Sequence, residues 1–178
     1  MDALLDTHLV RAAKVRLMIF DVDGVLTDGS LHFGADGEAM KTFNVHDGLG
    51  IKLLQQSGVQ TAIISARQSP IVTRRAFDLG IQHVLQGVHD KRVPFEKLLR
   101  DTGLDAEQCG FIGDDVIDLP ILSRVGFAVS VPNGRAEVLR RVHHVTQAGG
   151  GRGAVREVCE LLLRAQGNYE AIMAQFLG

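Results

Sequence analysis

Tryptophan is absent from this chain of 178 residues, and the other aromatic residues are few: eight Phe and one Tyr. A protein that stacks single-stranded nucleic acid bases needs several exposed aromatic side chains, so the composition disfavours that class. The formal net charge is -2. General binders of nucleic acid or of anionic membranes normally carry a basic excess, so the charge balance disfavours those classes as well.

Long apolar runs and clustered cysteines are also missing. No stretch approaches the roughly 20 apolar residues that a membrane span requires. Segment 1–9 carries an early acid and no sustained apolar run, which is unlike a secretory signal, so we expect a cytoplasmic protein. Cys109 and Cys159 lack the spacing of a metal site, and each lies in an apolar pattern. We therefore expect two buried thiols rather than a disulfide.

The chain does contain a regular alternation of short apolar runs and amphipathic segments. The apolar runs predict strands at 17–20, 61–64, 110–112 and 127–129. The amphipathic segments predict helices at 50–56, 69–80 and 91–102. Strands that alternate with helices predict a Rossmann-like, doubly wound α/β fold with a mainly parallel sheet covered on both faces. The length fits one domain over residues 1–178.

Residues 30–44 interrupt this alternation. Apolar and polar residues alternate here around Gly34-Ala35-Asp36-Gly37, which predicts a β-hairpin of 30–33 and 39–44. The hairpin lies within the first strand-to-helix connection, so we expect it to project over the active end as a flap in place of a cap domain. The chain ends in a predicted helical tail, 154–177, punctuated by Gly167.

Two acidic clusters directly follow predicted strands. Asp21 and Asp23 follow 17–20, and their side chains point the same way because they are two residues apart on an extended chain. The second cluster, 114–118, follows 110–112. An isolated Asp-x-Asp is best interpreted as a turn. Two clusters at the carboxyl ends of neighbouring parallel strands instead predict a hard-cation site, and Mg²⁺ accepts few carboxylates together with waters and phosphate oxygens.

Two further polar residues lie at strand or helix ends. Ser65 follows the predicted strand 61–64, where its hydroxyl and nearby N–H groups can donate to a phosphoryl oxygen. Lys91 lies in a first helical turn, where the helix dipole disfavours a cation unless an anion is near. Alone, each fits an ordinary helix-flanking Ser or a solvated Lys. Together with the acidic clusters, they favour a phosphoryl-transfer site.

The segment Asp21-Val22-Asp23-Gly24-Val25-Leu26-Thr27, then Ser65, Lys91 and 113–118, resembles in this order the four motifs of the haloacid dehalogenase-like phosphatase superfamily. The short hairpin and the segment 43–50 resemble, within it, the 3-deoxy-D-manno-octulosonate 8-phosphate phosphatase family. The resemblance covers about residues 15–166. It implies a magnesium-dependent phosphatase that releases the free sugar acid and phosphate in lipopolysaccharide precursor synthesis.

The resemblance also implies catalytic roles. Asp21 attacks phosphorus and forms an aspartyl-phosphate. Asp23 protonates the leaving sugar oxygen and then activates water. Ser65 and Lys91 stabilise the transferring phosphoryl group.

The implied magnesium ligands are the carboxylates of Asp21 and Asp114 and the backbone carbonyl of Asp23, while Asp115 and Asp118 position the loop or outer waters. The implied substrate-binding residues are Asp23, Asn44, Val45, His46, Asp47, Gly48, Lys52, Arg67, Arg75 and Lys91. Arginines suit the carboxylate of a sugar acid. Each of them also fits an ordinary solvated surface residue, and His46 also fits a helix cap.

The resemblance further implies a homotetramer whose hairpins form a small barrel. That assembly explains apolar residues on a hairpin that a small domain cannot cover: Leu31, Phe33, Met40 and Phe43. The tail is then expected to reach a neighbouring active site, with 149–153 as its hinge. Three consecutive glycines here depart from many relatives and leave the role of Arg152 open.

Two other functions compete with this interpretation. A phosphatase for nine-carbon sugar acid 9-phosphates needs the same catalytic residues, and the sequence does not separate the two. A non-catalytic assembly module of the same fold is disfavoured, because the catalytic set from Asp21 to Asp114 is intact. A receiver domain also uses Asp and Mg²⁺, but its acceptor strand is not followed by Asp-x-Asp-Gly.

Overall fold

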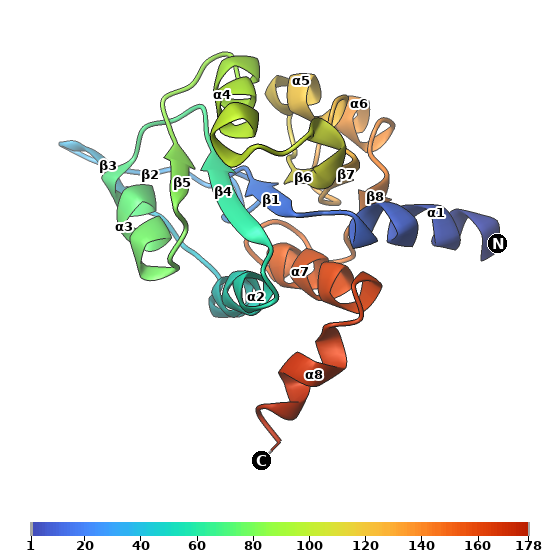
Figure 1. Cartoon of the computed structure of the whole chain (residues 1–178). Helices are drawn as coiled ribbons and strands as arrows, with labels where there is room; N and C mark the ends of the chain where they lie inside the picture. Colours follow the sequence, from blue (N-terminus) through green and yellow to red (C-terminus); the bar gives the residue numbers. More distant parts are fainter. Residues whose placement is uncertain (1, 178) are drawn as a thin grey trace.

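The computed structural model describes residues 2–177, and a six-stranded sheet forms its centre (Figure 1). In chain order the strands are β1 Leu17–Phe20, β4 Gln60–Ile64, β5 His83–Leu85, β6 Cys109–Ile112, β7 Phe127–Ser130 and β8 His144–Val145. Their spatial order is β5-β4-β1-β6-β7-β8, and every neighbouring pair is parallel. The predicted doubly wound parallel sheet is confirmed. The short edge strands β5 and β8 were not predicted. Neither is fully buried, and neither has a continuous apolar run like that of β1.

Helices cover both faces of the sheet (Figure 1). One core cluster packs the β1 side chains Met18 and Phe20 against α1 Asp2–Ala13, α2 Val45–Gln56, α3 Pro70–Asp78 and α7 Ala154–Ala165. The other packs Leu17 and Ile19 against α4 Arg92–Thr102, α5 Leu119–Leu122 and α6 Ala136–Leu139. Successive strand side chains point to opposite faces. A strand that is apolar at all four positions is therefore buried on both.

Helix ends follow local chemistry. Ser69 accepts a hydrogen bond from the N–H of Val72, and Pro70 occupies the first turn of α3. Gly103 ends α4 in the left-handed conformation that favours glycine. The predicted start of α2 at residue 50 is wrong. The helix begins at Val45, because the Asn44 side chain caps it by accepting from the N–H of His46 at 2.8 Å.

The hairpin is present but shorter than predicted, with β2 His32–Gly34 and β3 Gly37–Met40 in an antiparallel pair. Its second arm ends before residue 41, since Lys41 turns toward the sheet and Asn44 caps the next helix. Leu31, Phe33 and Met40 are 45%, 62% and 51% exposed. Figure 1 shows the hairpin extending from one side of the body.

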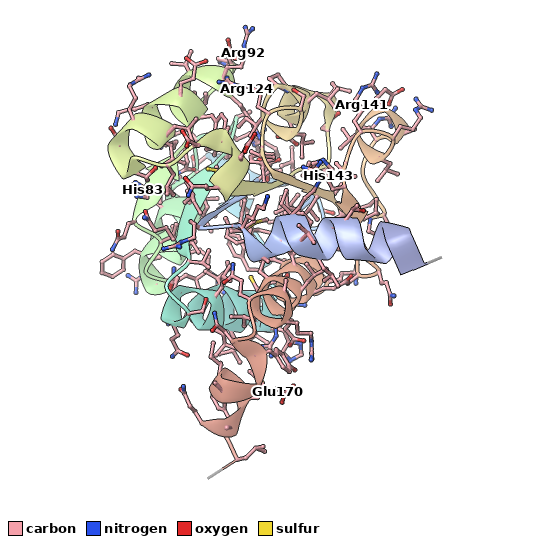
Figure 2. All side chains as sticks on the ribbon, turned by 45° about the vertical axis from the view of Figure 1, so that its right-hand side comes forward. His83, Arg92, Arg124, Arg141, His143 and Glu170 are labelled. Atoms are coloured by element: carbon pink, nitrogen blue, oxygen red, sulfur yellow. The ribbon has the colours of Figure 1, made fainter. Side chains whose placement is uncertain are left out.

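The predicted helical tail consists of two helices, α7 and α8 Tyr169–Ala174, with Gly167 at φ 73° between them. Glu170, on α8, lies on a segment that projects beyond the packed body (Figure 2). Two short 3₁₀ helices, η1 Ala106–Gln108 and η2 Val116–Asp118, flank β6. Across residues 2–177, no helix has both the length and the apolarity to cross a membrane. Both cysteines are buried and free, as predicted.

Candidate active site

The two acidic clusters meet where the chain reverses its direction across the sheet. From β1 the chain continues to β4 and β5 on one side, then returns to β6, β7 and β8 on the other. Ligand sites of open parallel sheets form in the crevice at the carboxyl ends of the strands that flank such a reversal. Asp21 follows β1 and Asp114 lies two residues beyond β6. A hydrogen bond of 3.0 Å from the Asp21 N–H to the Ile112 carbonyl joins the strand ends.

Three carboxylates converge in this crevice. One oxygen from each of Asp21, Asp114 and Asp118 lies within 4.8 Å of the other two. Gly24 makes room for them: its φ is +92°, and a Cβ at this position would lie 2.1 Å from Oδ2 of Asp114. Both the backbone conformation and the contact require glycine here. The turn after Asp23 therefore requires glycine at position 24.

Lys91 lies among these carboxylates. It is 1% exposed, and its Nζ donates to Oδ1 of Asp21 at 2.8 Å and to Oδ1 of Asp118 at 2.6 Å. Burial lowers the pKa of Lys91, but the two carboxylates outweigh it and raise the pKa overall. The ammonium therefore stays charged. The predicted anion beside the first turn of α4 is present, and it is a pair of carboxylates.

One ammonium cannot balance three carboxylates. Burial, and then the charge of Asp118, raises the pKa of Asp21 to about 7, although Lys91 opposes the shift. Burial, followed by the charges of Asp118 and Asp115, raises the pKa of Asp114 to about 7. Such a site favours an additional cation or protons. A compact set of hard oxygen donors with excess negative charge fits a divalent cation such as Mg²⁺.

Asp118 holds the second acidic loop in shape. Its Oδ2 accepts from the N–H groups of Asp114 at 3.0 Å and Asp115 at 3.2 Å, while its Oδ1 accepts from Lys91. A Cβ at Gly113 would lie 2.5 Å from Cγ of Asp118, so this close approach favours glycine there. The carboxylate of Asp115 instead caps the N–H of Val116. This geometry agrees with the loop-positioning role that the resemblance implies for Asp118.

Asp23 faces two cations, and one of them was not among the predicted site residues. Lys41 donates to Oδ1 of Asp23, and Nε of Arg67 lies 3.9 Å from Oδ2. The Lys41 side chain is only 1% exposed and also pairs with Oε1 of Glu38 at 3.0 Å. A lysine that follows a short exposed strand is ordinarily solvated. From the sequence alone, Lys41 would therefore be expected to be a solvated surface residue.

Ser65 takes the place that the sequence predicts, directly after β4 and next to the end of β1. It is 2% exposed, and its N–H donates to the Leu85 carbonyl at 2.9 Å. The register pairs Phe20, the last residue of β1, with Ile63, and Ser65 follows two residues later, directly after the end of the neighbouring strand β4. The structure thus brings Ser65 to the same edge of the sheet as Asp21.

The predicted substrate segment, residues 44–48, forms the first turn of α2 above Arg75. Nη2 of Arg75 lies 3.5 Å from the Asn44 carbonyl, and its guanidinium lies over the Phe43 ring at 5.7 Å. A Cβ at Gly48 would lie 2.4 Å from the same Nη2. Gly48 therefore packs directly against the Arg75 guanidinium. Val45 and His46 are exposed beside it, as is Lys52 further along α2.

Asp47 differs from its neighbours because its side chain points away from solvent. It is 1% exposed, and Oδ1 accepts from the N–H of Arg156 at 2.8 Å, at the start of α7. Burial raises the pKa of Asp47, although backbone N–H donors from the start of α7 oppose the shift. Asp47 thereby joins the substrate segment to α7, and direct contact with substrate stays a prediction.

The glycine run 149–151 packs against the loop that follows β1. A Cβ at Gly150 would lie 1.8 Å from the Gly24 carbonyl oxygen, and the N–H of Gly151 donates to the Val25 carbonyl at 2.8 Å. Asn133 joins the two segments by donating to the Gly24 carbonyl and accepting from the Gly150 N–H. Close packing against this backbone therefore explains why glycines occupy these positions. Their role as a hinge stays a prediction.

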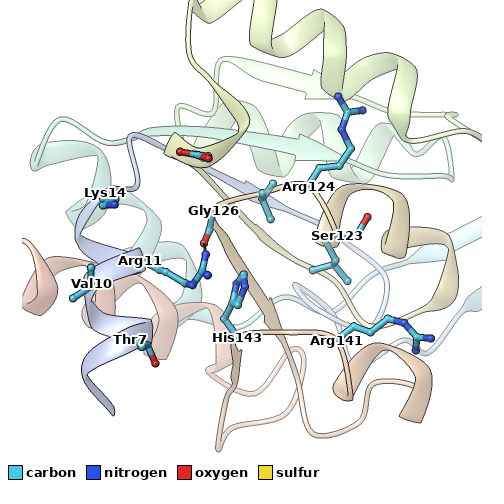
Figure 3. Close-up of a pocket in the computed structure, with 12 residues that line it drawn as sticks. Thr7, Val10, Arg11, Lys14, Ser123, Arg124, Gly126, Arg141 and His143 are labelled. Atoms are coloured by element: carbon cyan, nitrogen blue, oxygen red, sulfur yellow. Dashed lines mark hydrogen bonds between the residues drawn. The ribbon is translucent and has the colours of Figure 1, made fainter. Parts of the chain in front are cut away.

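A separate hollow of about 660 Å³ lies at the opposite end of the sheet (Figure 3). Residues just before β6, β7 and β8 line it, so it faces the amino ends of the strands. Three of its arginines already have partners: Arg11 donates to the Gly126 carbonyl at 3.1 Å, Arg124 pairs with Glu96 at 3.0 Å, and Arg141 donates to the Glu137 carbonyl at 2.7 Å. The acidic crevice, rather than this hollow, is the candidate active site.

Comparisons with known proteins agree with this geometry. Residues 80–155 match the family model of haloacid dehalogenase-like hydrolases. The 3-deoxy-D-manno-octulosonate 8-phosphate phosphatase of Yersinia pestis is 46% identical, over 93% of this chain and 88% of that protein.

Two solved structures are also closely similar. A probable YrbI family phosphatase from Pseudomonas syringae is 50% identical with a TM-score of 0.95, over 97% of this chain and 98% of the other. A 3-deoxy-D-manno-octulosonate 8-phosphate phosphatase from Moraxella catarrhalis, in complex with magnesium, phosphate and KDO, is 42% identical with a TM-score of 0.93, over 99% of each chain. The chain belongs to the 3-deoxy-D-manno-octulosonate 8-phosphate phosphatase family of haloacid dehalogenase-like hydrolases.

Proposed function

We propose that this protein is a magnesium-dependent phosphatase that hydrolyses 3-deoxy-D-manno-octulosonate 8-phosphate to the free sugar acid and phosphate. The observation that carries the proposal is the set of three carboxylates around Lys91, at the carboxyl ends of β1 and β6. A relative with 42% identity binds magnesium, phosphate and KDO. Phosphate release of this kind supplies a precursor of lipopolysaccharide.

Asp21 is the proposed nucleophile. Its carboxylate oxygen attacks phosphorus, a new P–O bond forms, and the bond from phosphorus to the sugar oxygen breaks. Lys91 keeps the Asp21 side chain in one orientation through the 2.8 Å hydrogen bond and offsets negative charge as the phosphoryl group arrives. Ser65 lies at the neighbouring strand end, where its hydroxyl can donate to a phosphoryl oxygen.

Asp23 is the proposed general acid and base. Its proton passes to the leaving sugar oxygen, and the resulting carboxylate then takes a proton from the water that attacks the aspartyl-phosphate. This second attack breaks the bond to Asp21 and restores both carboxyl groups. The side chain of Asp23 is 21% exposed, so both water and a sugar hydroxyl can reach it.

The carboxylates of Asp21 and Asp114 and the backbone carbonyl of Asp23 are the proposed magnesium ligands. When bound, the ion balances negative charge on the phosphoryl oxygens and orients them for in-line attack. The space that Gly24 leaves for Asp114 supports this ligand set. Asp118 completes the site because its carboxylate accepts from the N–H groups of Asp114 and Asp115 and so holds this loop in place.

The sugar acid is proposed to lie beside the hairpin and the first turn of α2. Arg67 and Arg75 provide positive charge for its carboxylate, and the 44–48 segment supplies donors for its hydroxyls. Asp23, Lys52 and Lys91 complete the proposed contacts. A nine-carbon sugar acid 9-phosphate is the alternative substrate, because it presents the same phosphate and carboxylate groups.

The wider setting is also proposed from the family resemblance. Residues 1–178 form a single phosphatase domain, the enzyme works in the cytoplasm, and four subunits assemble. The exposed apolar residues of the hairpin, such as Phe33 and Met40, support an assembly that covers them. Size-exclusion chromatography with light scattering tests the assembly, and a monomer at micromolar concentration would contradict it.

Asp21→Asn tests the chemistry. This nearly isosteric change removes the nucleophile and is expected to abolish magnesium-dependent phosphate release, while circular dichroism shows a folded protein. Asp101→Asn, the same change on the exposed face of α4, serves as the control and should keep full activity. Phosphate release by the Asp21 variant at the wild-type rate would exclude the mechanism.

The substrate itself needs a separate comparison. The kcat/KM of wild-type enzyme for the eight-carbon 8-phosphate should exceed that for a nine-carbon 9-phosphate and for simple hexose phosphates. A preference for the nine-carbon substrate would overturn the proposed substrate but leave the phosphatase mechanism intact.

A further inference from the structure

Lys41 is a buried cation without a predicted role, and its surroundings connect three parts of the site. It immediately follows β3 of the hairpin, yet its side chain is 1% exposed. Burying an ammonium is costly unless carboxylates surround it. Lys41 has two of them, Asp23 from the catalytic loop and Glu38 from the hairpin.

The contacts continue beyond Glu38. Its other oxygen, Oε2, accepts from the hydroxyl of Ser69, the residue that caps α3. The N–H of Ser69 in turn donates to Oε1 of Gln86 at 2.9 Å. A continuous polar chain therefore runs from Asp23 through Lys41 and Glu38 to the start of α3, and it fixes Lys41 from two sides.

Asp23 depends on this chain for its orientation. Among the described residues, Lys41 is the one that donates a hydrogen bond to its carboxylate, and Arg67 approaches the other oxygen only to 3.9 Å with a side chain that is 40% exposed. The carboxylates of Asp118 and Asp47 accept backbone N–H groups, whereas Asp23 relies on a side chain from the hairpin. Removing Lys41 would therefore remove the one hydrogen bond from a described residue that holds the Asp23 carboxylate.

We propose that Lys41 is a positioning residue that holds the Asp23 carboxyl in place for proton transfer to the leaving sugar oxygen. The inference rests on the proposed function, in which Asp23 is the general acid. Efficient proton transfer requires a well-aligned hydrogen bond, and a small misplacement of a catalytic group lowers the rate strongly. The hairpin thus contributes to catalysis through Lys41 as well as forming a flap.

The test uses two leaving groups that differ in their need for a proton. A sugar alkoxide leaves slowly unless it is protonated, whereas 4-nitrophenolate leaves readily without help. We expect Lys41→Met to slow sugar release in the first turnover by about 10- to 100-fold, part of the general-acid contribution. Release of 4-nitrophenolate from 4-nitrophenyl phosphate should slow by no more than about threefold on the same reasoning. First-turnover rates measure phosphoryl transfer alone, before hydrolysis of the aspartyl-phosphate.

Two further variants guard against a folding effect. Lys41→Gln keeps an N–H donor for Asp23 without the charge and should retain more sugar release than Lys41→Met. Lys97→Met, a matched change at an exposed lysine on α4 that has no proposed role in the site, reports any unspecific effect of removing a lysine. Thermal unfolding and half-saturation by Mg²⁺ should stay close to wild type in Lys41→Gln.

The outcomes separate the two proposals. Equal loss with both leaving groups, or no loss with either, would overturn the positioning role of Lys41. Wild-type enzyme that releases 4-nitrophenolate but no sugar would instead overturn the proposed substrate, whatever the Lys41 variants do.

Discussion

Gly24 allows the metal site to be tested without touching a carboxylate. Its φ of +92° is a conformation that other residues adopt only with strain, and an added Cβ would lie 2.1 Å from Oδ2 of Asp114. Gly24→Ala therefore has two separate effects. It strains the backbone, and it displaces the carboxylate that we propose as a magnesium ligand.

The strain can be measured on its own. Gly58 has φ +90°, and a Cβ there would meet no atom within 4 Å. Gly58→Ala therefore carries the same backbone penalty, about 1–3 kcal/mol of unfolding free energy, without the clash. For a domain of this size that penalty lowers Tm by about 2–4 °C per kcal/mol.

The difference between the two variants then measures the displacement of Asp114. Disturbing the shell around a metal site typically lowers metal affinity or activity by about 10- to 100-fold. We expect Gly24→Ala to raise the Mg²⁺ concentration for half-maximal phosphate release by that factor, and Gly58→Ala to leave it unchanged. The assay is phosphate release against Mg²⁺ concentration, with Tm recorded for both variants.

A single result would refute this reasoning. If Gly24→Ala and Gly58→Ala lose similar stability and keep the wild-type dependence on Mg²⁺, Asp114 is either not displaced or not a ligand. A crystal structure of the Gly24 variant would then distinguish the two.

Two more predictions address the charges. Lys91→Met leaves Asp21 and Asp118 buried without their counterion, so the unfolding free energy, measured by urea titration at pH 8, should fall by about 3–5 kcal/mol. The control Lys97→Met removes a lysine from an exposed ion pair and should change the unfolding free energy little. Equal effects of the two variants would contradict the role of Lys91 as the buried counterion. Burial lowers the pKa of His144 below its usual value of 6.5. As the pH falls below 6.5, the unfolded chain therefore binds a proton at His144 more readily than the folded state does. The contribution of neutral His144 to stability should be complete above pH 6.5 and lost as the pH falls below it. Thermal melts from pH 7.5 to 5 should show a shallower decline in His144→Gln, and an unchanged decline would argue against this origin.

Much of the site is local in the sequence and was predicted from it. Asp21, Asp114 and Ser65 each follow a strand, and the parallel sheet brings strand ends to one edge as a matter of geometry. The strand β1 was predicted with its observed bounds, because a strand buried on both faces is apolar throughout. Lys91 stood out because its charge opposes the helix dipole.

Other features could not be predicted, because they depend on contacts between residues distant in sequence. The start of α2 was predicted at residue 50, five residues later than the observed start at Val45. The structure shows instead that Gly48 packs against the Arg75 guanidinium and Gly50 against Arg156, both distant in sequence. The glycine run 149–151 likewise packs against the backbone of a distant segment, the loop that follows β1.

The sequence by itself determined the fold class and the order of the catalytic motifs, because hydrophobic periodicity and strand-end placement are properties of short segments. Tertiary structure alone decided which charges meet. Lys41 follows an exposed strand and has no local signal, yet the fold buries it between Asp23 and Glu38. The energy of a buried charge depends on the partners that the whole fold supplies, and no short segment contains that information.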